Sequence, residues 1–257
     1  MSTTLTERKK RLRDEFLESR GFWNEFLESL LDLDEDFFAA YSEFSSVPWK
    51  HGTLDPKIKE FVYISMNAAS THLYVPGIRQ HMKQAIALGA TAEEIMEVLE
   101  LTATLGIHAC NIGVPILVEE LAAAGKPISY ELSAHQEELK ADFTQKRGYW
   151  HQFFNEILIL DPDFFESYTH FSSVPWVTGV LEPKIKELIY TAFDVAATHL
   201  YSSGLRLHIK NALGYGATRE EILEVMELVS VIGMHSCALG VPILLEELAS
   251  ATDGKRA

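Results

Sequence analysis

The sequence repeats itself at a constant spacing of 127 residues, and this repeat constrains the fold more than any other feature. RGFWNEFL, which begins at Arg20, recurs as RGYWHQFF from Arg147, and GIHACNIGVPIL recurs later as GMHSCALGVPIL. A repeat unit of this length is a whole domain rather than one turn of a solenoid. The 257 residues are therefore predicted to be a tandem duplication, with one copy in residues 1–124 and the other in residues 125–257.

Both copies carry start signals for helices, and neither has a run that alternates with period two, as strands do. Proline follows an acidic residue at Asp55-Pro56 and at Glu182-Pro183, which is typical of the first turn of a helix. Thr91 and Thr218 each precede a glutamate by three residues, as in a capping box. We predict an all-α protein with six or seven helices per copy. The GVP segment near the end of each copy is expected to interrupt its last apolar run.

The charge balance narrows the classes of partner. The chain has 22 basic and 37 acidic residues and a net charge of −15, which disfavours binding to nucleic acid or to anionic membranes. The polar, basic N-terminus does not resemble a secretory signal. The longest apolar stretch, residues 229–245, contains His235 and Pro242, and we interpret it as a buried helix pair rather than a membrane span. We expect a cytoplasmic protein with no nucleic-acid or membrane partner.

The stretch from Lys59 to Pro115 resembles the carboxymuconolactone decarboxylase and alkylhydroperoxidase-D-like family. The resemblance rests on a Lys-Glu helix start, a motif that ends in His81, the sequence GAT-x-EEI from Gly89, and a late G-x-P. The second copy has the same elements, and the resemblance covers about 65 residues of each copy. It implies a tandem pair of alkylhydroperoxidase-D-like helical domains that act on a small molecule. Members of this family form rings of six single or three double domains, which implies a homotrimer here.

The sequence departs from the peroxidase members of this family. Those members carry C-x-x-C-x-x-x-H, whereas counting back from His81 places Tyr74 and Gly77 at the cysteine positions. The chain has only two cysteines, Cys110 and Cys237, in the downstream apolar run, where we expect them to be small buried residues. Peroxide reduction by this family needs a thiolate and a resolving thiol. The sequence therefore argues against a thiol peroxidase.

The polar residues kept in both copies around the motif are a carboxylate, two imidazoles, a phenol and a guanidinium. They are Glu60, His72, Tyr74, Arg79 and His81 in the first copy, and Glu187, His199, Tyr201, Arg206 and His208 in the second. Arginine can hold a substrate carboxylate, histidine can exchange a proton near neutral pH, and the glutamate can orient an imidazole. We assign these catalytic roles to Glu, His and Arg. The tyrosines, together with Trp49 and Trp176 in an expected packed loop, are assigned to substrate binding.

Three functions fit these residues. The leading hypothesis is a lyase that resembles the family's decarboxylases, needs no cofactor, and stabilises and reprotonates an enolate after loss of carbon dioxide. The second is a metal-dependent enzyme that uses Glu60, His72 and His81, and Glu187, His199 and His208, as two-histidine-one-carboxylate ligand sets. The third is a catalytically silent helical oligomer. His108 and His235 are also kept in both copies, and we interpret them as hydrogen-bonded core residues.

Overall fold

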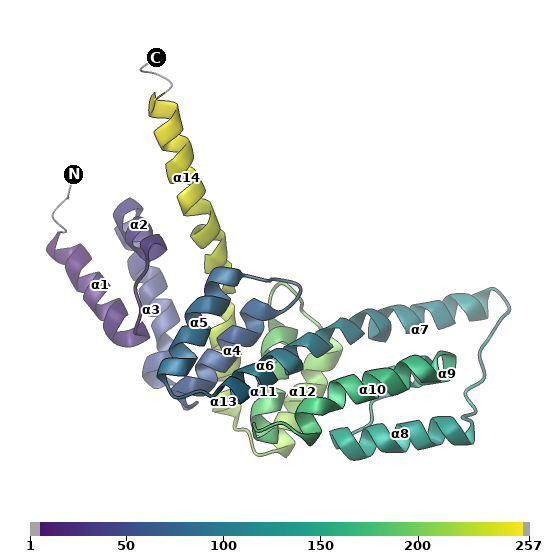
Figure 1. Cartoon of the computed structure of the whole chain (residues 1–257). Coiled ribbons are helices and arrows are strands. Elements are labelled where there is room, and N and C mark those ends of the chain that lie inside the picture. The colour runs from purple at the N-terminus through teal and green to yellow at the C-terminus, as the bar shows by residue number, and fades with distance from the viewer. Residues whose placement is uncertain (1–5, 254–257) are drawn as a thin grey trace.

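The computed structural model describes residues 6–253, and within them it contains helices and connecting loops but no strand (Figure 1). The helices of the first copy are α1 (Glu7–Arg20), α2 (Glu25–Leu33), α3 (Glu35–His51), α4 (Pro56–Ala68), α5 (Val75–Ala87), α6 (Ala92–Ala103), the 3₁₀ turn η1 (Thr104–Ile107) and α7 (His108–Ala123). Those of the second copy are α8 (Ala134–Arg147), η2 (Gln152–Phe154), α9 (Asn155–Leu160), α10 (Pro162–Val177), α11 (Pro183–Val195), α12 (Ser202–Gly214), α13 (Arg219–Ser230), η3 (Val231–Met234) and α14 (His235–Asp253). The all-α fold and the tandem duplication are confirmed.

The predicted helix starts are confirmed. Pro56 opens α4, and the side chain of the N-cap residue Asp55 accepts a hydrogen bond from the Lys57 amide at 2.8 Å. Proline suits this position because its missing N–H would have no partner in the helix. Both predicted capping boxes form at Thr91 and Thr218, where the threonine and the glutamate three residues later exchange hydrogen bonds with each other's backbone.

Two expected interruptions do not occur. Pro115 and Pro242 lie inside α7 and α14, so the GVP segment does not end either helix. The segment around Trp49, expected as a packed loop, is the last part of α3, and its counterpart around Trp176 belongs to α10. A proline removes one backbone hydrogen bond, yet both helices continue beyond it.

The core of the molecule is shared by the two copies. Nine consecutive residues of α4, from Lys59 to Asn67, are buried, and so are ten consecutive residues of α11. These two helices contact each other at the centre, where the Ser65 hydroxyl donates to the Ile189 carbonyl at 3.4 Å. Helices α5, α6, α12 and α13 surround them, and one hydrophobic cluster runs through all six. The duplicated helices therefore stabilise each other by burying a common apolar surface.

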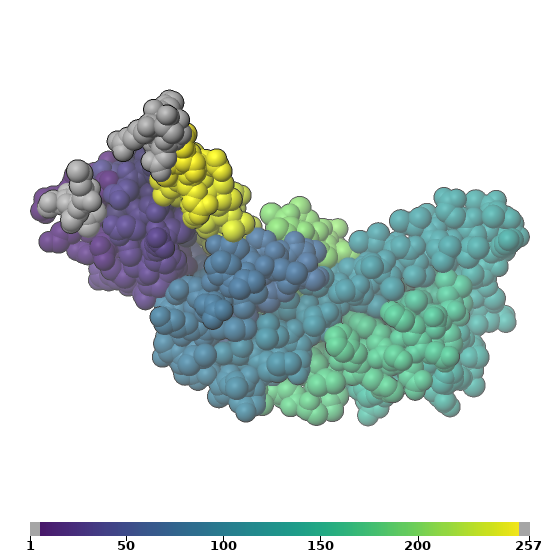
Figure 2. Space-filling model, turned by 45° about the horizontal axis from the view of Figure 1, so that its top comes forward, coloured from purple at the N-terminus to yellow at the C-terminus, as the bar shows by residue number. Residues whose placement is uncertain are grey.

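Each copy's last helix leaves its own copy and packs against the first helices of the other. Ile107 and Val114 of the first copy join a cluster with Phe143, Phe154 and Phe165 of the second. In the same way, Met234 and Val241 pack against the aromatic cluster of α1 to α3. The exchange produces two lobes that project from the central helices (Figure 1), and the space-filling view shows the surface hollowed between them (Figure 2). The predicted division at residue 124 follows the duplicated sequence, whereas each lobe takes helices from both copies.

Two buried carboxylates each form hydrogen bonds and an ion pair between the two copies. Glu224 of α13 accepts hydrogen bonds from the backbone amides of Thr53 and Leu54 at 2.6 and 2.9 Å, and it lies 2.8 Å from the Lys59 ammonium. Glu97 of α6 makes the equivalent contacts with the second copy. It accepts hydrogen bonds from the backbone amides of Val180 and Leu181 and forms an ion pair with the Lys186 ammonium. All four charged side chains are at least 96% buried, so each charge depends on its partner from the other copy.

The apolar stretch 229–245 is only partly buried, which corrects the expected buried helix pair. Val229, Val231 and Ile232 belong to the central core, but Leu239 and Ile243 of α14 are exposed because this helix contacts α2 on one face only. By length and composition, two continuous helical stretches, 92–123 and 219–251, could cross a membrane. Within this chain, 39% and 22% of their most apolar windows are buried.

Replacing Glu224 with alanine is expected to reduce the free energy of unfolding by about 3–5 kcal/mol, because Lys59 would remain buried without its partner. Urea denaturation followed by circular dichroism, at one protein concentration, measures this loss. Glu18→Ala on the exposed face of α1 serves as the control and should change stability by less than about 0.5 kcal/mol. Equal effects of the two substitutions would contradict the importance of the buried ion pair.

Candidate active site

A carboxylate and an imidazole form the central pair of each copy. Glu60 of α4 lies 2.7 Å from Nδ1 of His81 on α5, and both residues are buried. The equivalent Glu187 and His208 are 2.6 Å apart. A carboxylate accepts the Nδ1 proton, so the neutral imidazole keeps an unprotonated Nε2 that can exchange a proton with a bound molecule.

A buried arginine lies beside this pair. Arg20, at the end of α1, is 4% exposed and donates to the Ser45 carbonyl at 3.2 Å and to the Tyr63 hydroxyl at 3.3 Å. Tyr63 in turn stacks on the His81 ring with centroids 4.3 Å apart, and burial raises the pKa of its hydroxyl. Within residues 6–253, Arg20 has no acidic partner at ion-pair distance; aromatic rings such as Trp49, 5.3 Å away, surround the guanidinium. Such a buried, unneutralised cation favours the binding of an anion.

The second imidazole of each motif pairs across the two copies. His72 lies in the loop between α4 and α5, and its Nε2 is 2.7 Å from Nδ1 of His235, the first residue of α14. The loop holds Leu73 at a φ of 50°, a conformation that residues other than glycine rarely adopt. Tyr74 stacks on the His235 ring at 4.0 Å. His108 and His199 make the equivalent contact at 2.6 Å.

These histidines are neutral at physiological pH. Burial, together with the neighbouring His72 and His81, lowers the pKa of His235 to about 4. Burial and the nearby His199 and His208 lower the pKa of His108 to about 3. A histidine in this state can accept or share a hydrogen bond but carries no charge.

The histidine of the central pair, the arginine and the histidine contributed by the other copy line one cavity in each half of the molecule. The first cavity has a volume of about 90 Å³ and is lined by polar residues that include Arg20, Tyr63, Tyr74, His81 and His235, with apolar side chains around them. The second has a volume of about 20 Å³. Larger residues fill it, because Phe154 and Tyr149 stand where the first copy has Leu27 and Phe22. Of these two cavities, the first therefore has more room for a small organic molecule without side-chain movement.

The structure brings together some of the predicted site residues. Glu60 and His81 pair, Tyr74 lines the first cavity, and Glu187, His208 and Tyr201 are placed equivalently in the second copy. Their catalytic and binding roles remain predictions.

Other predicted residues lie elsewhere. Arg79 and Arg206 are exposed and do not line either cavity, because they occupy the solvent face of α5 and α12. Trp49 and Trp176 stack behind Tyr63 and Tyr190 rather than forming a cavity wall. Cys110 and Cys237 are free and half-buried, and neither lines a cavity.

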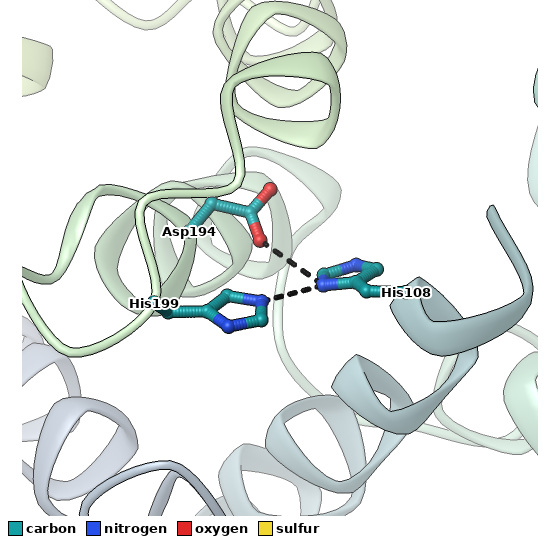
Figure 3. A group of neighbouring side chains, drawn as sticks. All are labelled: His108, Asp194 and His199. Carbon is teal, nitrogen blue, oxygen red and sulfur yellow. Dashed lines mark hydrogen bonds and ion pairs between the residues drawn. The ribbon is translucent and has the colours of Figure 1, made fainter. Parts of the chain in front are cut away.

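The two metal-ligand sets proposed from the sequence are not assembled. His72 and His199 contact the histidine of the opposite copy, and neither forms a group of three close potential ligands with its Glu–His pair among the described residues. Among the described residues, one group of three potential ligands lies within 4.8 Å of one another, and it is His108, Asp194 and His199 (Figure 3).

Sequence reasoning missed Arg20, Tyr63 and the role of His235. Arg20 and Tyr63 are kept in the second copy as Arg147 and Tyr190, so a comparison of the copies outside the family motif could have found them. His235 and His108 are kept in both copies, but their position in an apolar run favours the interpretation of core residues. No sequence signal predicted that each would enter the cavity of the other copy, because that depends on the exchange of α7 and α14.

Comparison of the chain with known proteins identifies its family. The Carboxymuconolactone decarboxylase family matches residues 35–109 and 162–234, together more than half of the chain. A crystal structure described as a "putative gamma-carboxymuconolactone decarboxylase subunit", from Burkholderia xenovorans LB400, superposes with a TM-score of 0.92 at 48% sequence identity. The match covers 95% of this chain and 98% of that one. No curated protein matches the chain.

The depressed pKa of His235 predicts a specific loss of stability in acid. An unfolded histidine has a pKa near 6.5, so between about pH 6.5 and 4 the unfolded state binds the additional proton. Stability is complete above pH 6.5 and falls as the pH falls. His235→Gln should remove roughly 1–3 kcal/mol of this acid loss, measured by urea denaturation across that range. The exposed His170 provides the control, since His170→Gln should leave the pH slope unchanged. Identical slopes in all three proteins would contradict the assignment.

Proposed function

The chain belongs to the carboxymuconolactone decarboxylase family, and on this premise we propose that it is a lyase that decarboxylates a small, carboxylate-bearing organic molecule without a cofactor. The observation that carries the proposal is that one cavity is lined by both a buried cation, Arg20, and a proton-exchanging residue, His81. Neither Cys110 nor Cys237 lines this cavity, which agrees with the argument against a thiol peroxidase.

Each group has a distinct part in the proposed reaction. Arg20 attracts the anionic substrate and stabilises the enolate oxygen that forms as carbon dioxide leaves. The electron pair of the broken carbon–carbon bond moves into the adjacent carbonyl. The protonated form of His81 then delivers a proton from Nε2 to carbon, and Glu60 stabilises the imidazolium before and during this transfer. His81 takes a new proton from water. The apolar lining, which includes Met66 and Met234, favours conversion of the charged carboxylate to neutral carbon dioxide.

The two copies are proposed to differ in activity. They keep the same Glu–His pair, arginine and tyrosine, but the cavity of the first copy is about 90 Å³ and that of the second about 20 Å³. We therefore assign most of the turnover to the first copy.

We further propose that the protein is a cytoplasmic homotrimer, as the family resemblance implies. Exposed apolar residues on the two exchanged helices support an assembly of this kind, since soluble proteins cover large apolar faces. They are Ile112, Ile116 and Leu117 on α7, and Leu239, Ile243, Leu244 and Leu248 on α14. The same faces account for the apolar character of the two stretches long enough to span a membrane. Sedimentation of a stable monomer would contradict this proposal.

The lyase proposal is tested by following carbon dioxide release from a panel of small keto and lactone carboxylates that includes γ-carboxymuconolactone. With a converted substrate, His81→Gln should lower kcat by about 10²–10⁴-fold, the range for loss of a general acid–base group. His208→Gln is the matched change in the second copy and should lower it by less than about twofold if the first copy does most of the work. Equal losses in the two variants would contradict the assignment to the first copy.

The role of Arg20 is separated from that of Arg79 by a second pair of variants. Arg20→Met should raise KM and lower kcat, because it removes the buried positive charge beside the substrate. Arg79→Met alters an exposed side chain and should leave both constants unchanged. No carbon dioxide release from any member of the panel, with none of them binding to the first cavity, would favour the catalytically silent oligomer instead.

A further inference from the structure

We propose that His108, Asp194 and His199 form a binding site for one divalent transition-metal ion of the Zn²⁺ or Co²⁺ type, and that only the second copy has this site. The site is distinct from the Glu187–His208 pair, and the ligands come from both copies: His108 begins α7, Asp194 lies near the end of α11, and His199 follows in the loop (Figure 3).

The geometry suits a single ion. One ligand atom from each residue lies within 4.8 Å of the other two, with Nδ1 of His108 2.6 Å from Nε2 of His199 and 3.9 Å from Oδ1 of Asp194. Ligands bound to Zn²⁺ at about 2.0–2.2 Å in a tetrahedral arrangement are roughly 3.3–3.5 Å apart. The two imidazole nitrogens would need to separate, and the Asp194 oxygen to approach the His108 nitrogen, by about 1 Å or less. Two histidines and one carboxylate are a common ligand set for such ions.

Asp194 provides an independent reason to expect a cation. Its side chain is fully buried, and neither carboxylate oxygen has a hydrogen-bond partner among the described residues. Its Oδ2 lies 4.0 Å from Nε2 of His208, too far for a hydrogen bond. Gly204 leaves room for this oxygen, since a Cβ at that position would be 2.3 Å from it. Burying this carboxyl group without hydrogen-bond partners costs free energy in either protonation state, and a bound cation would supply the missing partner.

The first copy shows what the site looks like without the carboxylate. His72 and His235 make the same imidazole contact at 2.7 Å, but Asn67 stands where the second copy has Asp194. The Asn67 amide donates to the Tyr63 carbonyl at 2.7 Å, which a carboxylate could not do. An amide is a neutral and weaker ligand, so the first copy should not hold the ion. The duplication therefore supplies a natural control within one chain.

The test is a titration of the chelator-treated, full-length protein with Co²⁺, followed by its visible d–d absorption, and with Zn²⁺ by calorimetry. The wild-type protein should bind one equivalent. Asp194→Asn, which copies the arrangement of the first half, should weaken binding by roughly 100-fold or more. Asn67→Asp should create a second site and raise the stoichiometry to two. Zn²⁺ should also raise the Tm of the wild-type protein but not that of Asp194→Asn.

Binding that is equally tight in the wild-type protein and in Asp194→Asn would overturn the proposal, because it would show an adventitious ion at exposed acidic residues. Failure of Asn67→Asp to bind a second equivalent while folded would overturn the claim that the carboxylate decides between the copies. If Asn67→Asp does not fold, His199→Gln in the second copy takes its place and should also lose the Co²⁺ absorption. Retention of that absorption would count against the site.

Discussion

The packing of each copy's last helix on the other copy's first helices is the interaction on which the rest of the structure depends. It buries the aromatic residues of both lobes, and it joins the copies through clusters that contain residues of each. It also carries His235 into the cavity of the first copy and His108 into that of the second. Each cavity is lined by residues of both copies, so a single copy could not form either cavity.

The two cavities keep one set of polar residues in different surroundings. Both keep the buried arginine and the hydrogen-bonded Glu–His pair. The differences are in the residues around them: Phe154 in place of Leu27 reduces the space, and Asp194 in place of Asn67 introduces a buried acid. The pKa of this acid is raised to about 8 by burial and by the nearby Glu187. One change of side chain inside a low-dielectric site therefore gives the two copies different electrostatics.

Site residues that lie near one another in the sequence could be predicted. Those that only the tertiary fold brings together could not. The Glu60–His81 pair joins two successive helices of one copy and was part of the predicted set. Arg79 was predicted to be the anion-binding group because it lies next to the motif, but it is exposed on α5. Arg20 is 40 residues upstream of Glu60, and only the packing of α1 and α3 on α4 brings its guanidinium to Tyr63. The GVP segments were expected to interrupt the last apolar run of each copy, but both helices continue past their prolines.

The sequence by itself determined that the protein is a duplicated, all-helical chain, where helices α4, α6, α11 and α13 begin, and which family motif it carries. Those properties follow from repeats, capping residues and apolar periodicity, which are local or can be compared position by position. Only the tertiary structure decided that α7 and α14 exchange partners, that His72 pairs with His235 instead of joining Glu60, and that one cavity is open while the other is nearly filled. The physical reason is that these features depend on which apolar faces bury each other across the two copies, and many pairings of amphipathic helices satisfy the same local pattern.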